Sequence, residues 1–451
     1  MKPYIILLII GFCLRESGSS FLFSTISDEC SKRYYSSTSF VCVCNSSYCN
    51  FDGSLLPFEE NQVRVVKSSQ DEFLDIIINV NTTIRKQSIH GFGGAVTDAA
   101  AIDIKSLSQE AQNNLIKMYF GPQGSRYNII RVNIAGCDFS VRGYSYDDIP
   151  IIKQAINLSS EEIYIFGSPW APPAWMKTNN DIGGDGQLRK DMWQPYADYL
   201  VKFFQMYEDN LGVQLWGFTP LNEPLVAMNR SDFPGNTCVW FPEDMRDWIS
   251  TVLGPTLEEE GYSRLILMIY DFNRLYLESY VEPILSDPSA NHYVDGTAVH
   301  WYDDDILGPE GLDNVHNMDP SKFILYTEAC TGTDGEDVAL GSWDRGEQYI
   351  NDIIEDINHW STGWVDWNIV LDQYGGPNWE DNYVDAPIIV NTTADEFYVQ
   401  PLYYALNLFS RNVARGSVYI HSDVNNDNIK TTAFVNPDEE VVLIVANLIS
   451  M

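Results

Sequence analysis

Two glutamates of the chain stand shortly after apolar runs. Residues 215–218 lead to Glu223, and residues 323–326 lead to Glu328. Hydrolysis of a glycosidic bond uses such a pair, because one carboxyl group protonates the leaving oxygen while the other meets the positive charge that develops on the sugar carbon. A separation of about 5 Å would indicate a covalent intermediate and retained configuration, and a wider one inversion. The alternative is two unrelated surface glutamates among the 63 acidic residues.

Aromatic and polar residues gather at the ends of other apolar runs. Aromatic rings stack on the C–H faces of a sugar, while carboxylates and amides bind its hydroxyl groups. Any one of the tryptophans could pack in the barrel core instead of binding a sugar. The gathering of several such residues is what favours a sugar site. The residues concerned are Asp138, Trp170, His300, Trp301, Tyr302, Trp367 and Asn368.

Other chemistries find little support. The six histidines include no H-x-x-x-H pair, so no zincin-type metal site is predicted, and there is no G-x-S-x-G nucleophile elbow. The glycines of residues 91–94 lack the third glycine of a dinucleotide loop and the lysine of a phosphate-binding loop. They are typical of close backbone packing in a first strand. We therefore expect neither a metal nor a cofactor.

The elements that position these residues follow from the alternation of short apolar runs with helical patterns. Near-continuous apolar runs are typical of strands that are buried on both faces, as in a parallel sheet. Counting residues 89–92 as the first strand gives eight β-then-α units over residues 88–394, which predicts a (β/α)8 TIM barrel. An open doubly wound sheet is the alternative. In a barrel all the strand ends meet at the C-terminal face, where the two glutamates and the aromatic cluster would converge.

Both flanks of the barrel differ from it. Residues 1–19 are typical of a signal peptide, with Lys2, a ten-residue apolar stretch and a small-residue cleavage zone. Residues 20–87 indicate a disulfide-bonded β segment with candidate strands at 63–66 and 74–80. Residues 395–451 contain three further candidate strands, at 418–420, 431–435 and 441–445. Strands at both ends of a barrel predict one small β-sandwich-like domain built from both termini.

Composition limits the partners and the compartment. The formal net charge of −36 excludes nucleic-acid binding and disfavours purely electrostatic binding to anionic lipid. It favours an acidic compartment, where carboxylate protonation relieves repulsion, with an ordinary solvated surface as the alternative. Four cysteines within residues 30–49 predict two disulfides, and Cys137, Cys238 and Cys330 predict buried thiols. Five sequons predict a glycosylated lumenal protein, at Asn45, Asn81, Asn157, Asn229 and Asn391.

Several ordered segments carry a family resemblance that runs from about Cys30 to the end of the chain. The sequence resembles the glucosylceramidases, or acid β-glucosidases, of glycoside hydrolase family 30. The segments that carry it are Val41-Cys42-Val43-Cys44-Asn45, Gly91-Phe92-Gly93-Gly94-Ala95, Asn128-Ile129-Ile130-Arg131-Val132, Cys137-Asp138-Phe139-Ser140, Ser168-Pro169-Trp170, Asn222-Glu223-Pro224, His300-Trp301-Tyr302, Glu328-Ala329-Cys330, Gly341-Ser342-Trp343-Asp344-Arg345-Gly346 and Gly375-Gly376-Pro377-Asn378-Trp379.

The resemblance implies roles for individual residues. It implies a retaining mechanism in which Glu223 is the acid/base and Glu328 the nucleophile. The first must then be protonated while the second is ionised, which favours a pH below neutrality. It implies the bridges Cys30–Cys42 and Cys44–Cys49, substrate binding by Asp138, Trp170, Asn222, Trp367 and Asn382, and support of the site by Arg131, His300 and Tyr302.

The resemblance also implies a substrate and a setting. The expected substrate is glucosylceramide, a membrane glycolipid, hydrolysed to glucose and ceramide in the lysosome lumen or, as an alternative, outside the cell. A saposin-type activator, anionic lipid and peripheral contact with the membrane are the expected partners. The family's β-domain continues beyond the position that matches Met451, so residues 395–451 are expected to be a truncated form of it. A transglucosidase and an inactive sugar- or lipid-binding paralogue remain the alternatives.

Overall fold

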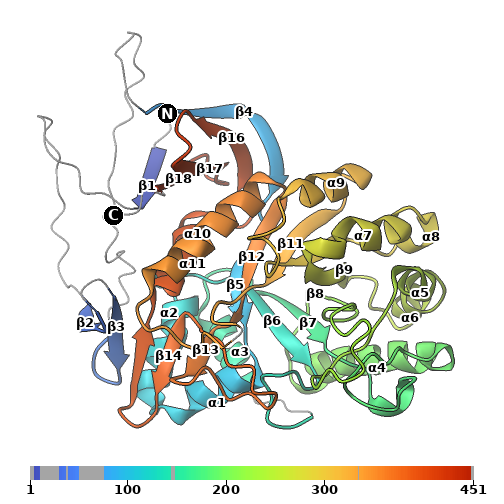
Figure 1. Ribbon diagram of the computed structural model, residues 1–451. Helices are drawn as coiled ribbons and strands as arrows, with labels where there is room; N and C mark the ends of the chain where they lie inside the picture. The colour runs from blue at the N-terminus through green and yellow to red at the C-terminus, as the bar shows by residue number, and fades with distance from the viewer. Residues whose placement is uncertain are drawn as a thin grey trace, which may run out of the picture.

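The computed structural model describes residues 5–10, 30–36, 39–49, 76–143, 148–333 and 335–447. Its centre is a closed barrel of eight parallel strands in which β12 pairs with β5 (Figure 1). The predicted TIM-type barrel is confirmed. The strands are β5 (Gly91–Ala95), β6 (Ile129–Ile134), β7 (Tyr164–Pro169), β8 (Gly217–Phe218), β9 (Ile266–Asn273), β10 (Gly296–His300), β11 (Phe323–Glu328) and β12 (Ser361–Asn368).

The first barrel strand lies further along the chain than the prediction of residues 89–92. It spans Gly91–Ala95, and Ile89 and His90 precede it. A Cβ atom on Gly93 would lie 1.8 Å from the backbone oxygen of Ile129 on β6. Glycine is therefore required at this position for β5 and β6 to approach each other, as the glycine pattern predicted.

Helices cover the outside of the barrel (Figure 1). On α10 the isoleucines at 350, 353, 354 and 357 are buried, in the amphipathic pattern that the sequence predicts. The α-helices are α1 (Asp98–Ser106), α2 (Gln109–Phe120), α3 (Ile149–Leu158), α4 (Trp193–Gln205), α5 (Pro242–Trp248), α6 (Gly254–Glu259), α7 (Leu277–Leu285), α8 (Pro288–Asn291), α9 (Glu310–Met318), α10 (Trp343–Asn358) and α11 (Pro401–Asn412). Short 3-10 turns are η1 (Ala174–Met176), η2 (Lys190–Met192) and η5 (Arg274–Tyr276), and π turns are η3 (Met206–Asn210) and η4 (Ile249–Leu253).

The barrel interior has an apolar part and a polar part. The polar side chains that could do chemistry lie toward the C-terminal ends of the strands, where β10 ends at His300 and β11 at Glu328. The apolar cluster gives them a rigid support, because close-packed interiors resist deformation. It consists of Ile129, Phe166, Met268, Ala298, Leu325 and Val365.

Two five-stranded sheets flank the barrel. One has the order β1-β18-β17-β16-β4, so it combines strands from both ends of the chain, as predicted. The other has the order β13-β14-β15-β3-β2 and takes up the cysteine-rich strands, which do not join the first sheet. The strands are β1 (Ile5–Ile10), β2 (Ser31–Tyr34), β3 (Phe40–Asn45), β4 (Ile78–Ser88), β13 (Val370–Asp372), β14 (Ile388–Asn391), β15 (Glu396–Val399), β16 (Val418–Val424), β17 (Ile429–Val435) and β18 (Val441–Asn447).

The structure bears on several other expectations. Disulfides join Cys30 to Cys42 and Cys44 to Cys49, and the three remaining described cysteines are buried and free.

Part of the predicted signal peptide, β1, pairs in parallel with β18. The candidate strand at 63–66 lies outside the described residues. All five sequon asparagines are at least partly exposed, and their glycosylation stays a prediction. Among the described helices, none has the length and apolar character needed to span a bilayer.

Candidate active site

Glu223 and Glu328 meet at the C-terminal face of the barrel. Glu328 is the last residue of β11, and Glu223 lies on the segment that follows β8. One oxygen of each carboxyl group and one ring nitrogen of His300 all lie within 4.8 Å of one another. The backbone of Glu223 has φ +47°, a left-handed conformation that costs free energy in a non-glycine residue and is common at functional sites. Its N–H donates to the carbonyl oxygen of Asp271 at 2.9 Å, which holds the strained backbone in place.

Glu328 is buried among hydrogen-bond donors. Arg131 donates from Nη1 to Oε2, and the Tyr302 hydroxyl donates to Oε1 at 2.8 Å. The guanidinium of Arg131 is itself fully buried on β6. A cation and a hydroxyl donor on the two oxygens of one carboxyl group favour its ionised form.

Asp271 lies at the centre of the buried network, and the sequence analysis missed it. It accepts from Arg131 Nη2 at 2.9 Å and from the Thr219 and Thr327 hydroxyls at 2.7 Å each. Burial alone would raise its pKa, but Arg131 and His300 outweigh burial and hold the pKa well below its usual range. Its position at the end of the apolar run 265–270 was the available signal.

A β-bulge explains why Asp271 points into the site. The register between β9 and β10 shifts so that Tyr270 and Phe272 have successive partners and Asp271 is skipped. Both Tyr270 and Asp271 have positive φ angles, 82° and 55°. A bulge redirects a side chain relative to a regular strand. Such a redirection depends on backbone geometry that residue types alone do not specify.

His300 bridges two carboxylates. Its Nδ1 lies 3.0 Å from Glu223 Oε1, and its Nε2 lies 3.0 Å from Asp271 Oδ1. Burial disfavours the charged ring, but Glu328, Asp271 and Glu223 outweigh it and raise the pKa to about 9. Both ring nitrogens therefore carry protons and donate. An imidazolium has no lone pair for a metal ion, so the group Glu223, His300 and Glu328 is better described as an ion network than as a metal site.

The two glutamates have different electrostatic surroundings. Burial raises the pKa of Glu223, and the neighbouring Glu328 raises it further, whereas His300 and Arg131 lower it. The net effect is upward. Unlike Glu328, Glu223 has no direct hydrogen bond from Arg131. The arrangement can hold one carboxyl group protonated while the other is ionised, which is the condition for acid and nucleophile roles in one pocket.

Two tryptophans form an aromatic wall beside this pair. Trp170 follows β7 and Trp367 lies on β12, and their rings stack with centroids 5.2 Å apart. The Arg131 guanidinium lies 5.0 Å from the Trp170 ring and 5.3 Å from the Trp367 ring. Arg131 Nη2 also donates to Asn222 Oδ1 at 2.7 Å. That bond turns the amide so that its NH2 group faces away from Arg131.

Asp138 lies in the loop after β6. Its Oδ2 accepts from Asn382 Nδ2 at 3.1 Å and from Asn378 Nδ2 at 3.3 Å. Burial first, and then Glu380 and Glu328, raise its pKa to about 8. Asn382 is exposed, and it reaches the site through this contact. The sequence analysis named Asp138 and Asn382 but missed Asn378 and Glu380, whose roles depend on loop packing.

The chain has clear matches among known protein families. Residues 89–150 and 148–413 match the glycosyl hydrolase family 30 TIM-barrel domain, and residues 416–450 match the family's beta sandwich domain. The chain belongs to glycoside hydrolase family 30. It is a glycoside hydrolase with the family's two-part architecture of barrel and β-sandwich.

Two known proteins illustrate what the chain is similar to. The lysosomal acid glucosylceramidase of Mus musculus is 37% identical, over 95% of this chain and 92% of its own length. The crystal structure of SrfJ from Salmonella typhimurium superimposes with a TM-score of 0.78 at 27% identity, over 84% of this chain and 87% of that chain. The resemblance that the sequence motifs indicated is confirmed.

Proposed function

We propose that this family 30 enzyme is a retaining β-glucosidase that hydrolyses glucosylceramide through a covalent glucosyl-enzyme. The observation that carries the proposal is the short separation of the two carboxyl groups, with an oxygen of each within 4.8 Å of the other. Retaining glycosidases hold their carboxyl groups about 5 Å apart, whereas inverting ones leave room for a water molecule between them. The similarity to a lysosomal acid glucosylceramidase supports the substrate.

In the first step Glu223 is the acid and Glu328 the nucleophile. The Glu223 proton passes to the glycosidic oxygen as the bond between that oxygen and the anomeric carbon breaks. A Glu328 oxygen bonds to the same carbon, and the alcohol leaves. The raised pKa of Glu223 supports its protonated start, and the Arg131 and Tyr302 donors support an ionised Glu328.

In the second step Glu223 becomes the base. Once Glu328 is esterified, its negative charge is gone, and one of the causes that raise the pKa of Glu223 disappears. The pKa then falls, so that Glu223 can accept a proton from water as the water oxygen attacks the anomeric carbon. The ester bond breaks, glucose leaves, and Glu328 returns to its carboxylate form.

The remaining site residues fit the binding of one glucose unit. Trp170 and Trp367 offer aromatic surface, and Asp138 offers a carboxylate for sugar hydroxyl groups. The Asn222 NH2 group, oriented by Arg131, is suited to the 2-hydroxyl, a contact that strengthens in the transition state. Asn382 supports Asp138 from the loop side.

Several exposed apolar side chains suit a substrate that is held in a membrane. These residues follow the barrel strands on the face that carries the site, and large exposed apolar side chains favour contact with lipid or with a protein partner. They support peripheral contact with a membrane. Anionic lipid and a saposin-type activator as partners, and the lysosome lumen as the compartment, are proposed from the similarity to a lysosomal acid glucosylceramidase. The residues are Val141, Trp175, Phe241, Leu275, Ile306, Tyr374 and Trp379.

The decisive experiment combines product analysis with a nucleophile variant. The full chain is assayed near pH 5 with glucosylceramide in mixed micelles and with an aryl β-D-glucoside, and the initial anomer of glucose is identified by NMR. We expect β-glucose first, and a loss of at least about 10³-fold in kcat for Glu328→Gln with an unchanged circular dichroism spectrum. Initial α-glucose would refute retention. Hydrolysis of the aryl glucoside without the lipid would refute the substrate, and a folded protein inactive on both would indicate a binding paralogue.

A further inference from the structure

Three loops meet beside Asp138 on the face of the barrel that carries the site. Asp138 lies on the loop after β6. Asn236 lies on the connection from β8 to α5, which also carries Glu223, and Glu380 lies on the connection from β13 to β14. Neither step of the proposed reaction uses Glu380, yet its side chain is partly buried at the point where these loops join.

The carboxyl group of Glu380 connects two of these loops, and Asn236 connects them to the third. Glu380 Oε1 accepts from the backbone N–H of Asn236 at 3.0 Å. The side chain of Asn236 donates from Nδ2 to the carbonyl oxygen of Gly136, on the loop after β6, at 2.8 Å. A Cβ atom on Gly235 would lie 2.1 Å from Glu380 Oε2, so the carboxyl group packs directly against the backbone of Gly235.

The contacts continue from Glu380 to Asp138 through two asparagine side chains. The backbone N–H of Glu380 donates to Asn378 Oδ1 at 2.7 Å, and Asn378 Nδ2 donates to Asp138 Oδ2 at 3.3 Å. Asn382 uses the same two partners, because its backbone N–H donates to Asn378 Oδ1 at 3.2 Å and its Nδ2 donates to Asp138 Oδ2 at 3.1 Å. Both amides therefore hold the same oxygen of Asp138, which fixes the orientation of that carboxyl group.

From this chain of contacts we propose that Glu380 is a positioning residue for sugar binding. By joining the loop of residues 378–382 to Asn236, it sets the place at which Asn378 and Asn382 hold the Asp138 carboxyl group. The inference rests on the proposed function, in which Asp138 binds hydroxyl groups of glucose. These contacts do not involve the bond that is cleaved, so Glu380 contributes equally to the ground state and the transition state.

The test compares two substitutions of Glu380 in the full chain, with an aryl β-D-glucoside as substrate near pH 5. Glu380→Ala removes the acceptor for the Asn236 N–H. We expect its KM to rise about tenfold while kcat stays within about threefold of the parent value, because loss of uniform binding affects KM alone. Glu380→Gln keeps an oxygen that can accept the same hydrogen bond, so it should recover most of the loss.

Gly235→Ala tests the same contact without changing Glu380. The added methyl group displaces the Glu380 carboxyl group, and the backbone of Gly235 has no positive φ that would oppose alanine. We expect the same rise in KM as for Glu380→Ala. Circular dichroism of each variant checks its fold, and Gly235→Ala supplies the test if Glu380→Ala does not fold.

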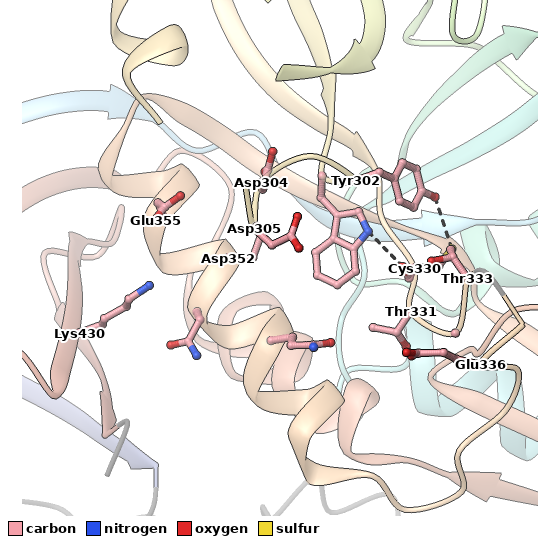
Figure 2. A pocket seen from close by; sticks show the side chains of 14 residues that line it. Tyr302, Asp304, Asp305, Cys330, Thr331, Thr333, Glu336, Asp352, Glu355 and Lys430 are labelled. Carbon is pink, nitrogen blue, oxygen red and sulfur yellow. Dashed lines mark hydrogen bonds between the residues drawn. The ribbon is translucent and has the colours of Figure 1, made fainter. Parts of the chain in front are cut away.

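A double-mutant cycle separates positioning of Asp138 from a general loosening of the loops. In an Asp138→Ala background, Glu380→Ala should lower kcat/KM little further, because the group that it positions is gone. The matched control Glu336→Ala removes an exposed carboxylate from the loop after β11, and it should leave KM unchanged. Glu336 borders a separate cavity of about 520 Å³ that Tyr302 and Cys330 also line (Figure 2) and that does not include Asp138 or Glu380.

Several results would overturn the proposal. An equal fall in kcat/KM with and without Asp138 would show that Glu380 acts elsewhere. A lower kcat at unchanged KM would indicate a contact made only in the transition state, and a Glu380→Gln variant as weak as Glu380→Ala would assign the effect to charge. An unchanged KM in Glu380→Ala and Gly235→Ala would show that the contact has no role in binding.

A binding measurement keeps this test separate from the test of the proposed function. Calorimetry follows deoxynojirimycin, an iminosugar with the hydroxyl pattern of glucose, which needs no turnover. A parent enzyme that binds the iminosugar but does not cleave the glucoside would refute the proposed function alone, and the affinity of the Glu380 variants would still test the positioning role. A parent that neither binds nor cleaves would overturn both.

Discussion

At the scale of single residues, Asp271 and Arg131 organise the site more than either glutamate does. Both are fully buried, and together they contact Glu328, His300 and Asn222. A buried ion network costs desolvation free energy, and it persists only when every charge has partners. The partners here are the groups that must hold fixed positions for chemistry. The network therefore fixes the orientation of Glu328, His300 and Asn222 at a cost in desolvation free energy.

The environment of Glu223 leads to a prediction about leaving groups. Glu223→Gln removes the proton donor but leaves the fold and Glu328 intact. We expect turnover of glucosylceramide to fall about 10²- to 10⁴-fold, the usual contribution of general acid–base catalysis. A dinitrophenyl glucoside, whose leaving group needs no proton, should show a much smaller effect on the first step, visible as a burst of phenolate. An equal loss for both substrates, without a burst, would contradict the acid role.

Asp271 leads to a second residue-scale prediction. Asp271→Asn keeps the shape but removes a charge that faces Arg131 and His300. We expect kcat to fall about 10²-fold, as for a small misplacement of reacting groups. The pKa of His300 should also fall toward its ordinary value, because one cause of its elevation is lost. The measurements are the pH–rate profile and an NMR titration of the His300 ring, with Asp427→Asn as an exposed control. An unchanged His300 pKa would contradict the account.

At the scale of elements, apolar continuity in the sequence predicted the barrel well. Residues 297–300 and 323–326, for example, fall within β10 and β11, because a strand buried on both faces leaves a run without polar breaks. Because Glu223 and Glu328 follow two of these strands, the sequence also predicted that both lie at the C-terminal face of the barrel. The same reasoning misplaced the start of β5, where glycines and long-range packing set the boundary.

Features that depend on distant partners were not predictable from local pattern. The strand β3, which carries Cys42 and Cys44, joins β15 by antiparallel pairing of residues more than 350 positions apart, such as Cys42 and Val399. Asp271 enters the site only through a bulge. Asn378 and Glu380 approach Asp138 through loop packing. In each case the determining contact is remote in the sequence, and no local periodicity reports it.

The two disulfides give a prediction for one element. One links Cys30, directly before β2, to β3, and the other closes a short turn after β3, in the sheet that also contains β13–β15. The double variant Cys30→Ala/Cys42→Ala should lower stability by about 2–4 kcal/mol, seen as a lower Tm. Because this sheet does not carry the two glutamates, turnover at 25 °C should remain near that of the parent. Loss of turnover with an unchanged Tm would contradict the view that this disulfide stabilises the sheet without affecting the active site.

At the scale of the whole molecule, the net charge and the burial of carboxyl groups both make the folded state more stable in acid than at neutral pH. The net charge of −36 implies self-repulsion at neutral pH. Burial raises the pKa of Asp103 to about 9 and of Asp148 to about 7. Groups whose pKa is raised on folding contribute stability that is complete below the unfolded pKa, about 4 for an aspartate, and is lost as pH rises through the folded value. Both effects favour the folded state in acid.

This argument predicts a higher Tm at pH 5 than at pH 7.5. His300, with a pKa near 9, contributes in the same direction. Asp271 has the opposite sign, since its pKa is lowered, but its contribution is lost only below about pH 4 and leaves this window unaffected. Differential scanning fluorimetry should show a fall of several degrees between the two pH values, as about 1 kcal/mol shifts the Tm of a large domain by about 2 °C. Added salt should reverse the part of this fall in Tm that is due to repulsion between surface charges. Asp103→Asn should reverse part of the remaining fall, because a buried neutral amide has no charge to acquire. A Tm that stays level or rises between pH 5 and 7.5 would mean that other ionisations dominate the stability of the folded enzyme.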